Sequence, residues 1–424
     1  MWMQKIYIGL IGLGTVGGSV ARILQEHTDL IAKRAGVQIC VKMAVVRDVA
    51  KYANFGIPVS ANIEDVLEDE AISIVVELIG GIEYPFDLAK RVFAKNKALV
   101  SANKAMLAHH MRDLMECAKN APIGFEASVC GGVPVIEVLR DSLVANHIVS
   151  FEGILNGTSN YILTQMFEQK MSFERALQEA QRLGYAESDP SLDVNGLDAG
   201  HKLVILAQLA YGIAVPMGDV LVEGIEGIVL EDLCFADEWG YRIKLLGIAT
   251  LSNGTLDLRL HLALIPKDTY LAKIDGVTNA LSVRGDCVGE VNLCGLGAGG
   301  DATASAVIAD LVSIARCRNG AYPLPPFGFF ESSDCATIKP KGEIESAYYL
   351  RFIVCNRSGV LAKITQILAD CNISVNEILQ KEKGGEVMIG LITYQTQEQH
   401  ISKALCALAQ LDFMQQAPYK IRIR

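Results

Sequence analysis

The stretch KIYIGLIGLGTVGGSV, Lys5 to Val20, decides the fold of the first part of the chain. Its apolar residues from Ile6 to Ile11 predict a buried strand, and the residues from about Thr15 to His27 predict an amphipathic helix. The glycines between the strand and the helix follow the pattern GxGxxG, at Gly12, Gly14 and Gly17.

This glycine pattern is typical of a loop that binds the pyrophosphate of a dinucleotide. The glycines permit a tight turn, and the helix N-terminus that follows favours an anion. The pattern alone is weak evidence, because a tightly packed turn can carry it too; here strand, loop, helix and second strand follow in order. We expect Thr15 and Val16 to join the three glycines in contacting the cofactor.

Two residues of opposite charge follow the second predicted strand, Gln38 to Val46. Asp48 suits the ribose 2′-hydroxyl of NAD, whereas Arg47, supported by Lys51, suits the 2′-phosphate of NADP. Both side chains are also compatible with solvated loop charges. The sequence leaves NAD and NADP open, and Arg47 is our candidate for a cofactor contact.

Strands alternate with helices as far as about residue 150, which predicts a parallel sheet wrapped by helices, a Rossmann-type dinucleotide-binding domain. A helix is expected from Pro85 to Lys95, where proline suits the first turn. Further strands are expected at Ile72 to Leu78, Ala98 to Ser101 and Ile123 to Glu126.

Residues 151–318 mix longer helices with shorter strands such as Leu256 to Leu264, which predicts a separate α+β domain. The apolar stretch from Leu203 to Gly218 is too short for a membrane span and predicts a core helix. The segment NGAYPLPPFG, Asn319 to Gly328, opens a linker over 319–346. Residues 347–424 read strand, helix, strand, strand, helix, strand, with a turn at Lys381 to Gly385, an order that is ferredoxin-like.

The composition narrows the class of protein. The chain has 424 residues, 51% hydrophobic, and a net charge of −10 with no long run of one sign, so we expect a small-molecule partner rather than nucleic acid or a membrane. Eleven cysteines without a CxxC pair suggest reduced thiols rather than a zinc site. The N-terminus enters strand-like sequence without an apolar leader, so we expect a cytoplasmic location.

The segment LGYAESDPSLDVNGLDAGHK, Leu183 to Lys202, gathers charged residues around prolines and glycines. Pro190 is expected to stop a helix near Ser188 and to leave Glu187 on a loop. A new helix from about Gly196 would put Asp198 and Lys202 on one face, where a plain surface ion pair is the alternative.

At this segment the sequence resembles the homoserine dehydrogenase family. SANKA (Ser101 to Ala105) and NGTSNYIL (Asn156 to Leu163) match further motifs of that family, and the resemblance covers essentially the whole chain. It implies NAD(P)-dependent interconversion of aspartate semialdehyde and homoserine, in the biosynthesis of threonine, methionine and isoleucine. No aspartate kinase segment is present, so the monofunctional form is implied.

The resemblance also implies roles for individual residues. Lys202 is the implied proton donor, and Lys104 lies next to the nicotinamide and the substrate. Glu187, Asp193 and Asp198 hold the substrate's amino group or orient Lys202. The remaining implied contacts are Tyr185, Gly157 and Thr158 with the substrate and Gly184 with the cofactor.

Two glycine-containing segments have an open interpretation. EASVCGGVPVI, Glu126 to Ile136, resembles a segment that binds a monovalent cation such as sodium, but by itself it reads as a strand-to-helix turn. GLGAGG, Gly295 to Gly300, would be a second phosphate loop or a close packing contact; the resemblance puts Gly299 beside the cofactor. The implied cation ligands are Glu126, Val129, Gly131 and Val133.

The tail from Phe352 to Gln380 resembles an ACT domain, a module that binds amino acids. Gly359 would let a ligand carboxylate reach backbone amides, and Asn356 stands where that family usually has an aspartate. Threonine is the implied effector and a homodimer or homotetramer the implied assembly, although the tail could serve dimerisation alone. Because the catalytic motifs precede the linker, we expect the catalytic part to work without the tail.

Two other functions fit parts of this pattern. A nucleotide-sensing regulator would combine a dinucleotide fold with an ACT domain, but it would not need the cluster from Glu187 to Lys202. Another amino-acid oxidoreductase of the same architecture is the second alternative. Oxidation or reduction of NAD(P)H with homoserine, aspartate semialdehyde, aspartate and glutamate separates all three.

Overall fold

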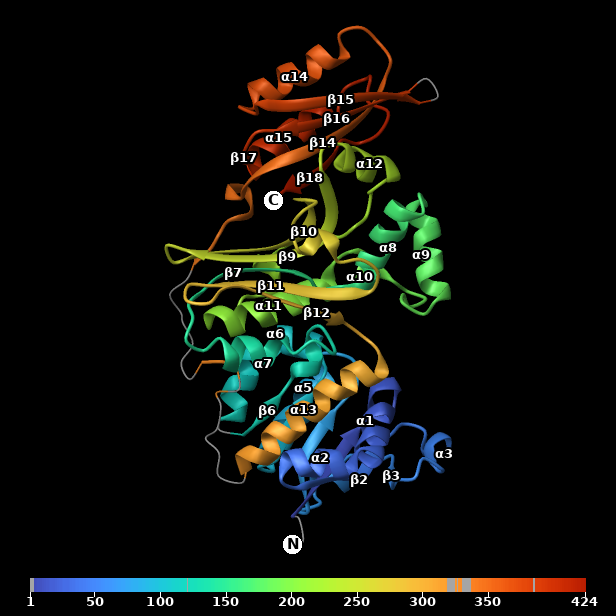
Figure 1. Ribbon diagram of the computed structural model, residues 1–424, viewed down its shortest axis with the longest axis vertical. Coiled ribbons are helices and arrows are strands. Elements are labelled where there is room, and N and C mark those ends of the chain that lie inside the picture. The colour runs from blue at the N-terminus through green and yellow to red at the C-terminus, as the bar shows by residue number, and fades with distance from the viewer. Residues whose placement is uncertain (1–3, 120, 319–324, 326, 330–336, 384–385) are drawn as a thin grey trace. The chain divides into compact units, whose positions relative to one another are not determined.

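The computed structural model describes residues 4–119, 121–318, 325, 327–329, 337–383 and 386–424. The chain divides into two compact units, each built from three segments (Figure 1). Unit 1 contains residues 1–148, 201–217 and 279–334, and unit 2 contains residues 149–200, 218–278 and 335–424. Helix α11 (Leu197–Tyr211) continues from the one unit into the other.

The centre of unit 1 is a parallel sheet in the order β3-β2-β1-β4-β5-β6. This is the strand order of a Rossmann sheet, in which ligands bind at the carboxyl ends of the strands where the chain changes direction, here between β1 and β4. The predicted Rossmann-type fold is confirmed. The strands are β1 (Lys5–Ile11), β2 (Gln38–Val45), β3 (Val59–Ser60), β4 (Ile72–Glu77), β5 (Ala98–Ser101) and β6 (Ile123–Gly124).

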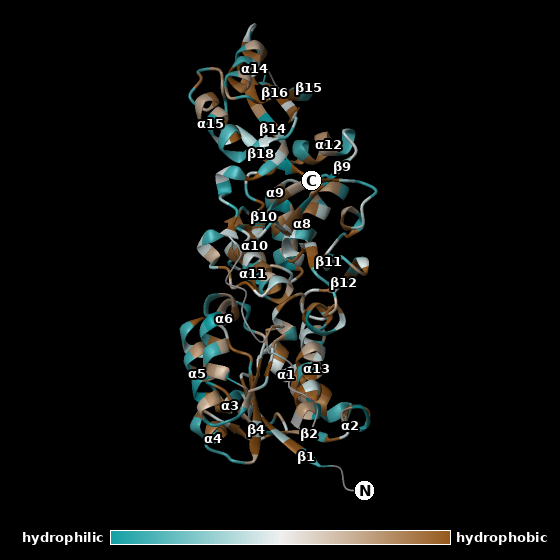
Figure 2. Ribbon diagram, turned by 90° about the vertical axis from the view of Figure 1, so that its left-hand side faces the viewer, coloured by the Kyte–Doolittle hydropathy of each residue, from teal (hydrophilic) through white to brown (hydrophobic). Residues whose placement is uncertain are grey.

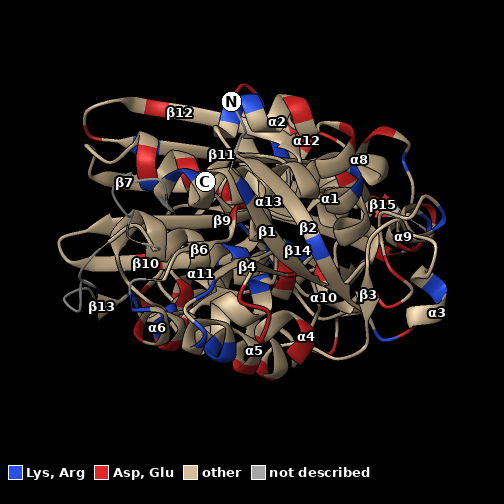
Figure 3. Cartoon of the chain, turned by 90° about the horizontal axis from the view of Figure 1, so that it is seen from below, with Lys and Arg blue, Asp and Glu red and all other residues tan. Residues whose placement is uncertain are grey.

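Helices cover this sheet, and its strands are apolar enough to be buried on both faces. Ile8, Leu10, Ile74 and Val76 have no exposed surface, and the strands are brown in Figure 2. Blue and red segments are intermixed on α4, α5 and α6 (Figure 3). The helices of unit 1 are α1 (Thr15–Glu26), α2 (Thr28–Ala35), α3 (Val49–Tyr52), α4 (Glu64–Leu67), α5 (Glu83–Ala94), α6 (Lys104–Ala118), α7 (Val135–Glu137) and α13 (Gly300–Arg318), and the strands β11 (Thr278–Gly285) and β12 (Gly289–Leu296) precede α13.

Unit 2 is built on a mixed sheet in the order β7-β9-β10-β18-β14-β16-β15. The tail therefore joins the sheet of the middle segment, because β18 pairs with β10 on one side and with β14 on the other. The strands are β7 (Ile148–Ile154), β9 (Tyr241–Ser252), β10 (Thr255–Pro266), β14 (Glu345–Cys355), β15 (Val375–Lys383), β16 (Glu386–Thr393) and β18 (Tyr419–Ile423), with the short strands β8 (Leu221–Val222), β13 (Thr337–Ile338) and β17 (Thr396–Gln397).

The helices of unit 2 complete the expected α+β and ferredoxin-like patterns. Around the two-residue β17, the tail runs β14, α14, β15, β16, α15, β18, as predicted for a ferredoxin-like domain. The helices are α8 (Gly157–Glu168), α9 (Phe173–Arg182), α10 (Ser191–Val194), α12 (Leu230–Glu238), α14 (Val360–Asp370) and α15 (Glu398–Leu408).

Three predicted boundaries are wrong. The helix expected to stop near Ser188 ends six residues earlier with α9. Helix α11 ends at Tyr211 rather than running to Gly218, because Gly212 takes a left-handed conformation with φ of 71°. Strand β6 stops at Gly124, since a 3₁₀ turn begins at Glu126.

Other expectations fall on parts of the chain that the structure does not describe. Most of the segment from Asn319 to Gly328 and the last two residues of the turn at Lys381 to Gly385 lie outside the described residues. Among the described residues, no helix is both long and apolar enough to cross a membrane.

Candidate active site

The glycine loop between β1 and α1 is closely packed at Gly12 and Gly17 but open at Gly14. A Cβ atom at Gly17 would lie 2.1 Å from the carbonyl oxygen of Gly12, so only glycine fits there. Gly12 has φ of 102° and donates its amide to the carbonyl of Val45 at 2.9 Å. A Cβ at Gly14 would meet nothing within 4 Å. The loop thus leaves open space at the amino end of α1, where a pyrophosphate can approach the backbone.

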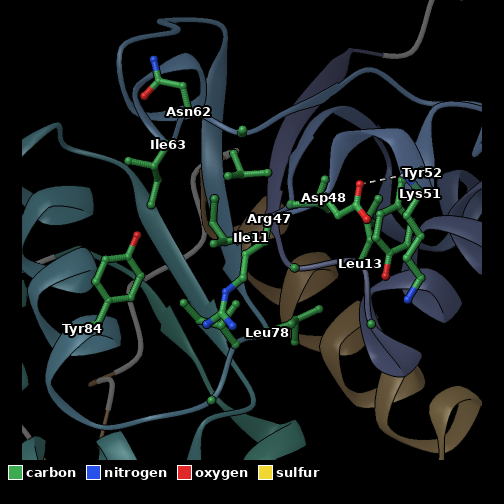
Figure 4. Close-up of a pocket in the computed structure, with 17 residues that line it drawn as sticks. Ile11, Leu13, Arg47, Asp48, Lys51, Tyr52, Asn62, Ile63, Leu78 and Tyr84 are labelled. Carbon is green, nitrogen blue, oxygen red and sulfur yellow. Dashed lines mark hydrogen bonds between the residues drawn. The ribbon is translucent and has the colours of Figure 1, made fainter.

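A cavity of about 690 Å³ opens beside this loop at the carboxyl ends of β1, β2 and β4 (Figure 4). Asp48 turns toward α3 and accepts a hydrogen bond from the Lys51 amide at 3.2 Å, which caps that helix. Arg47 and Asp48 both line the cavity, and the Arg47 side chain reaches into it (Figure 4). Other lining residues include Ile11, Gly12, Leu13, Gly14, Leu78, Ile79, Gly80 and Tyr84.

Lys104 is the first residue of α6 and is partly buried. The preceding residue, Asn103, caps this helix by accepting a hydrogen bond from the Met106 amide at 3.0 Å. The Asn103 amide group also donates to the carbonyls of Ile79 (3.1 Å) and Gly81 (2.9 Å), in the turn that follows β4. The position of Lys104 is therefore tied to the segment that lines the nucleotide cavity.

In unit 2, one asparagine joins two of the predicted substrate-binding carboxylates. The Asn156 amide donates to Asp193 at 2.7 Å and to Asp198 at 2.9 Å. Its own oxygen accepts a hydrogen bond from the Ser159 amide at 2.7 Å and caps α8. Two carboxylates held side by side form a natural site for a cation such as a substrate ammonium.

Thr158 and Tyr185 lie close to each other, because the Thr158 hydroxyl donates to the Tyr185 carbonyl at 2.8 Å. Tyr185 is 45% exposed and makes an edge contact with the ring of Tyr161. Glu187 is exposed on the loop after α9, where the Gln181 amide donates to its carbonyl. Gly184 belongs to the same loop, and Gly157 begins α8.

Asp198 and Lys202 both belong to α11, one helical turn apart on the same face. They are only 6% and 7% exposed, so the alternative of a solvated surface ion pair does not fit. Buried ionisable groups are enriched at functional sites, and they also occur in structural ion pairs.

The segment proposed for a cation makes a sharp turn. Cys130 and Gly131 follow each other with φ of 54° and 49°. The Glu126 carboxylate accepts hydrogen bonds from the amides of Ile136 (2.9 Å) and Glu137 (2.7 Å), while burial raises the pKa of Glu126 to about 7. Val129 and Val133 are buried on either side of the turn.

The loop GLGAGG is packed against α1 at its end. A Cβ at Gly300 would lie 2.8 Å from the Ser19 hydroxyl, and that hydroxyl donates to Asp301 at 2.7 Å. Gly299 has φ of 122° and open space around it.

In the tail, Gly359 precedes α14 with φ of 87° and lines a cavity of about 270 Å³ together with Arg357, Lys363 and Asp412. Asn356 is exposed and is not among the lining residues.

Sequence reasoning missed two residues at these sites. Asn156 stands inside the motif NGTSN, but its link to two carboxylates 37 and 42 positions away depends on the fold. Asn103 follows a predicted strand and precedes a predicted helix, so its helix-capping position was the available signal.

Comparisons with known proteins agree with this architecture. A family model described as "Homoserine dehydrogenase, NAD binding domain" matches residues 12–124, "Homoserine dehydrogenase" matches residues 134–312, and "ACT domain" matches residues 348–413. A homoserine dehydrogenase of Helicobacter pylori is 51% identical over 422 residues, covering 99% of both chains.

Solved structures give the same result. The homoserine dehydrogenase of Thiobacillus denitrificans superposes with a TM-score of 0.93 at 41% identity, covering 100% of this chain and 99% of that one. A hyperthermophilic archaeal homoserine dehydrogenase mutant in complex with NADPH has a TM-score of 0.64 at 27% identity and covers 76% of this chain.

The Rossmann sheet, its open glycine loop and the catalytic-domain match define an NAD(P)-dependent oxidoreductase that carries an ACT domain. Two family models together match well over half of the chain, and relatives match it along its whole length. The chain belongs to the homoserine dehydrogenase family, whose members interconvert aspartate semialdehyde and homoserine.

Proposed function

We propose that the Asn156 cluster holds the substrate's ammonium group and that Lys202 donates the proton for reduction of aspartate semialdehyde. The observation that carries this proposal is the pair of carboxylates, Asp193 and Asp198, bridged by one amide. Glu187, Gly157, Thr158 and Tyr185 would complete the substrate pocket.

When bound, the dihydronicotinamide would supply the hydride that the aldehyde carbon accepts. Lys202, as an ammonium, donates a proton to the aldehyde oxygen, so that the aldehyde becomes the primary alcohol of homoserine. The role proposed for Lys104 is to favour the developing negative charge on oxygen. In the reverse direction Lys202 accepts the proton of the hydroxyl.

The test is turnover with homoserine and aspartate semialdehyde, compared with aspartate and glutamate. We expect Asn156→Ala to raise the KM for homoserine about tenfold or more, while NADPH binding stays unchanged, because a hydrogen bond to a charged group typically contributes about 1.5 to 3 kcal/mol. Asn160→Ala is the matched control, since Asn160 lies in the same helix but donates to the carbonyls of Ile274 and Gly276. Unchanged homoserine KM in Asn156→Ala would contradict the assigned ammonium site.

For the cofactor we propose a preference for NADP. Arg47 and Asp48 both line the cavity, but the Asp48 carboxylate is engaged in capping α3, which favours a 2′-phosphate at Arg47 over a ribose hydroxyl at Asp48. The archaeal relative in complex with NADPH is consistent with this preference. Cofactor contacts are proposed for Gly12, Gly14, Thr15, Val16, Gly17, Arg47, Lys104, Gly184 and Gly299.

A monovalent cation at the turn from Glu126 to Val133 is a separate proposal. It is supported by the consecutive left-handed residues, which turn the backbone sharply near Val129, Gly131 and Val133. Turnover in sodium or potassium chloride, compared with choline chloride at equal ionic strength, tests this site. Equal rates in all three salts would exclude a required cation.

For the tail we propose feedback inhibition by threonine at Gly359 and the neighbouring amides, with Asn356 beside the site, in a homodimer or homotetramer. Calorimetry with threonine, methionine and isoleucine tests binding, and Gly359→Val should remove it. If none of the three amino acids produces heat of binding, the tail serves assembly alone.

We also propose a cytoplasmic location and domain boundaries near residues 150, 318 and 346.

A further inference from the structure

A buried carboxyl group stands at the end of β4, and the roles proposed above do not use it. Glu77 has no exposed surface. It pairs in register with Ser101, the last residue of β5, so the two side chains lie next to each other at the carboxyl edge of the sheet. One Glu77 oxygen accepts a hydrogen bond from the Ser101 hydroxyl at 2.5 Å, and the other accepts one from the Ile79 amide at 2.8 Å.

Ser101 extends this connection toward Lys104. Its hydroxyl oxygen accepts a hydrogen bond from the Asn103 amide at 3.0 Å. The Asn103 side chain in turn donates to Ile79 and Gly81, so the hydrogen bonds return to the turn that Glu77 already holds. The turn after β4 and the start of α6 are thus fixed by a single closed network.

This network borders the nucleotide cavity, because Ile79 and Gly80 line it. Burial raises the pKa of Glu77 to about 7. The hydrogen bonds that Glu77 accepts favour its ionised form and only partly oppose this shift. A carboxyl group in such a place destabilises the fold relative to an apolar residue, and perturbed groups of this kind cluster at functional sites.

We propose that Glu77 is a positioning residue of the hydride-transfer site. Through Ser101 it fixes the end of β5 that leads into Lys104 and α6, and through Ile79 it fixes the turn that borders the nucleotide cavity. The inference rests on the role proposed for Lys104 and extends it.

The experiment compares Glu77→Gln, Ser101→Ala, the double variant and Lys104→Met with the parent. Lys97→Met is the matched control, because the buried Lys97 ammonium donates to the carbonyls of Asp69 and Ile72, both at 2.6 Å, at the opposite end of β4. Turnover of aspartate semialdehyde, the dissociation constant of NADPH from fluorescence titration, and the melting temperature are measured for each.

We expect Glu77→Gln and Ser101→Ala each to lower kcat about tenfold or more, since small misplacements of reacting groups can reduce rates about 100-fold. The dissociation constant of NADPH should change less than about threefold, because the glycine loop and Arg47 stay in place. The double variant should resemble the worse single variant, as members of one network are not additive. Lys97→Met should lower the melting temperature and leave kcat unchanged.

The possible contrary results separate the inference from the proposed function. If the parent protein turns over neither aspartate semialdehyde nor homoserine, the proposed function itself is refuted. If Lys104→Met is impaired and Glu77→Gln retains kcat within about twofold of the parent, the inference alone is overturned. It is also overturned if Lys97→Met loses as much kcat as Glu77→Gln, or if Lys104→Met keeps full activity.

Discussion

At the scale of single residues, the proposed proton donor is a buried lysine, as Lys97 and Lys244 are. Lys202 is 7% exposed although an ammonium is costly to remove from water. Lysine is suited to general acid chemistry because its pKa responds to its surroundings.

We expect Lys202→Ala to lower kcat by about 10² to 10⁴, the usual contribution of a positioned proton donor. NADPH affinity should be retained. Lys244→Met is the control, since Lys244 is also buried but pairs with Asp275 in unit 2. If Lys202→Ala turns over within a few-fold of the parent at saturating substrate, the proton comes from another group.

Arg47 allows a second test at this scale. Arg47→Ala should weaken NADPH more than NADH, because only NADPH offers a phosphate to the guanidinium. A loss of about tenfold for NADPH corresponds to about 1.4 kcal/mol. Lys51→Ala measures the contribution of a neighbouring charge on the same cavity. Equal losses for both cofactors in Arg47→Ala would assign Arg47 to solvent.

At the scale of helices and strands, the tail is tied to the middle of the chain by buried contacts. Arg351 of β14 pairs with Asp232 of α12, and the hydroxyl of Tyr349 donates to the same carboxylate at 2.7 Å. Burial raises the pKa of Asp232 to about 6, although Arg351 opposes the shift. Arg422 of β18 pairs with Glu223 from the middle segment.

Because of these contacts, we expect removal of the tail to affect both the stability of unit 2 and turnover. We now expect removal of residues 347–424 to destabilise unit 2 and to reduce turnover. It would uncover the end of β10 at Ala263 and Leu264 and leave Asp232 without Arg351 and Tyr349. Breaking one buried ion pair typically costs about 3 to 5 kcal/mol. A thermal melt and an assay of the truncated chain test this expectation.

Gly359→Val in the full chain is the better probe of regulation, because it leaves these contacts intact. A truncated chain that melts and turns over like the parent would restore the earlier expectation of an independent catalytic part.

The elements that the sequence predicted well are those with local signals. The glycine loop, β1 and α1 follow from apolar spacing and the GxGxxG pattern, and β5 matches its predicted bounds from Ala98 to Ser101. The insertion of β18 between β10 and β14 could not be predicted, because it joins residues more than 150 positions apart. For the same reason, the hydrogen bonds of Asn156 and Glu77 could not be predicted, because their partners are distant in sequence and come together only in the folded chain.

At the scale of the whole molecule, buried carboxyl groups make stability depend on pH. Burial, together with the neighbouring Glu126 carboxyl, raises the pKa of Asp310 to about 8. The folded state keeps a proton that the unfolded chain loses above its ordinary pKa near 4. The free energy of unfolding should therefore fall as pH rises from about 4 to about 8.

Asp310→Asn should reduce this fall, because the amide stays neutral and can still accept the hydrogen bond from the Glu126 backbone amide. At pH 8 the free energy of unfolding of the variant should exceed that of the parent by at least about 1 kcal/mol. This difference is smaller than the free energy that corresponds to a shift of one pKa unit. Melting temperatures from pH 5 to pH 8.5 test this, with Glu68→Gln as an exposed control whose slope should match the parent. Identical slopes for parent and Asp310→Asn would contradict the raised pKa.

The place of β18 in the sheet of unit 2 also bears on how the protein is made. A ribosome releases the chain from its N-terminus at about 5 to 20 residues per second, and domains usually fold as they emerge. Here β18 lies between β10 and β14 yet is synthesised after both. The nascent chain must keep the end of β10 at Ala263 and Leu264 unpaired until Tyr419–Ile423 has left the ribosome. During that interval the exposed strand edge is the part of the newborn protein most in need of protection by a chaperone.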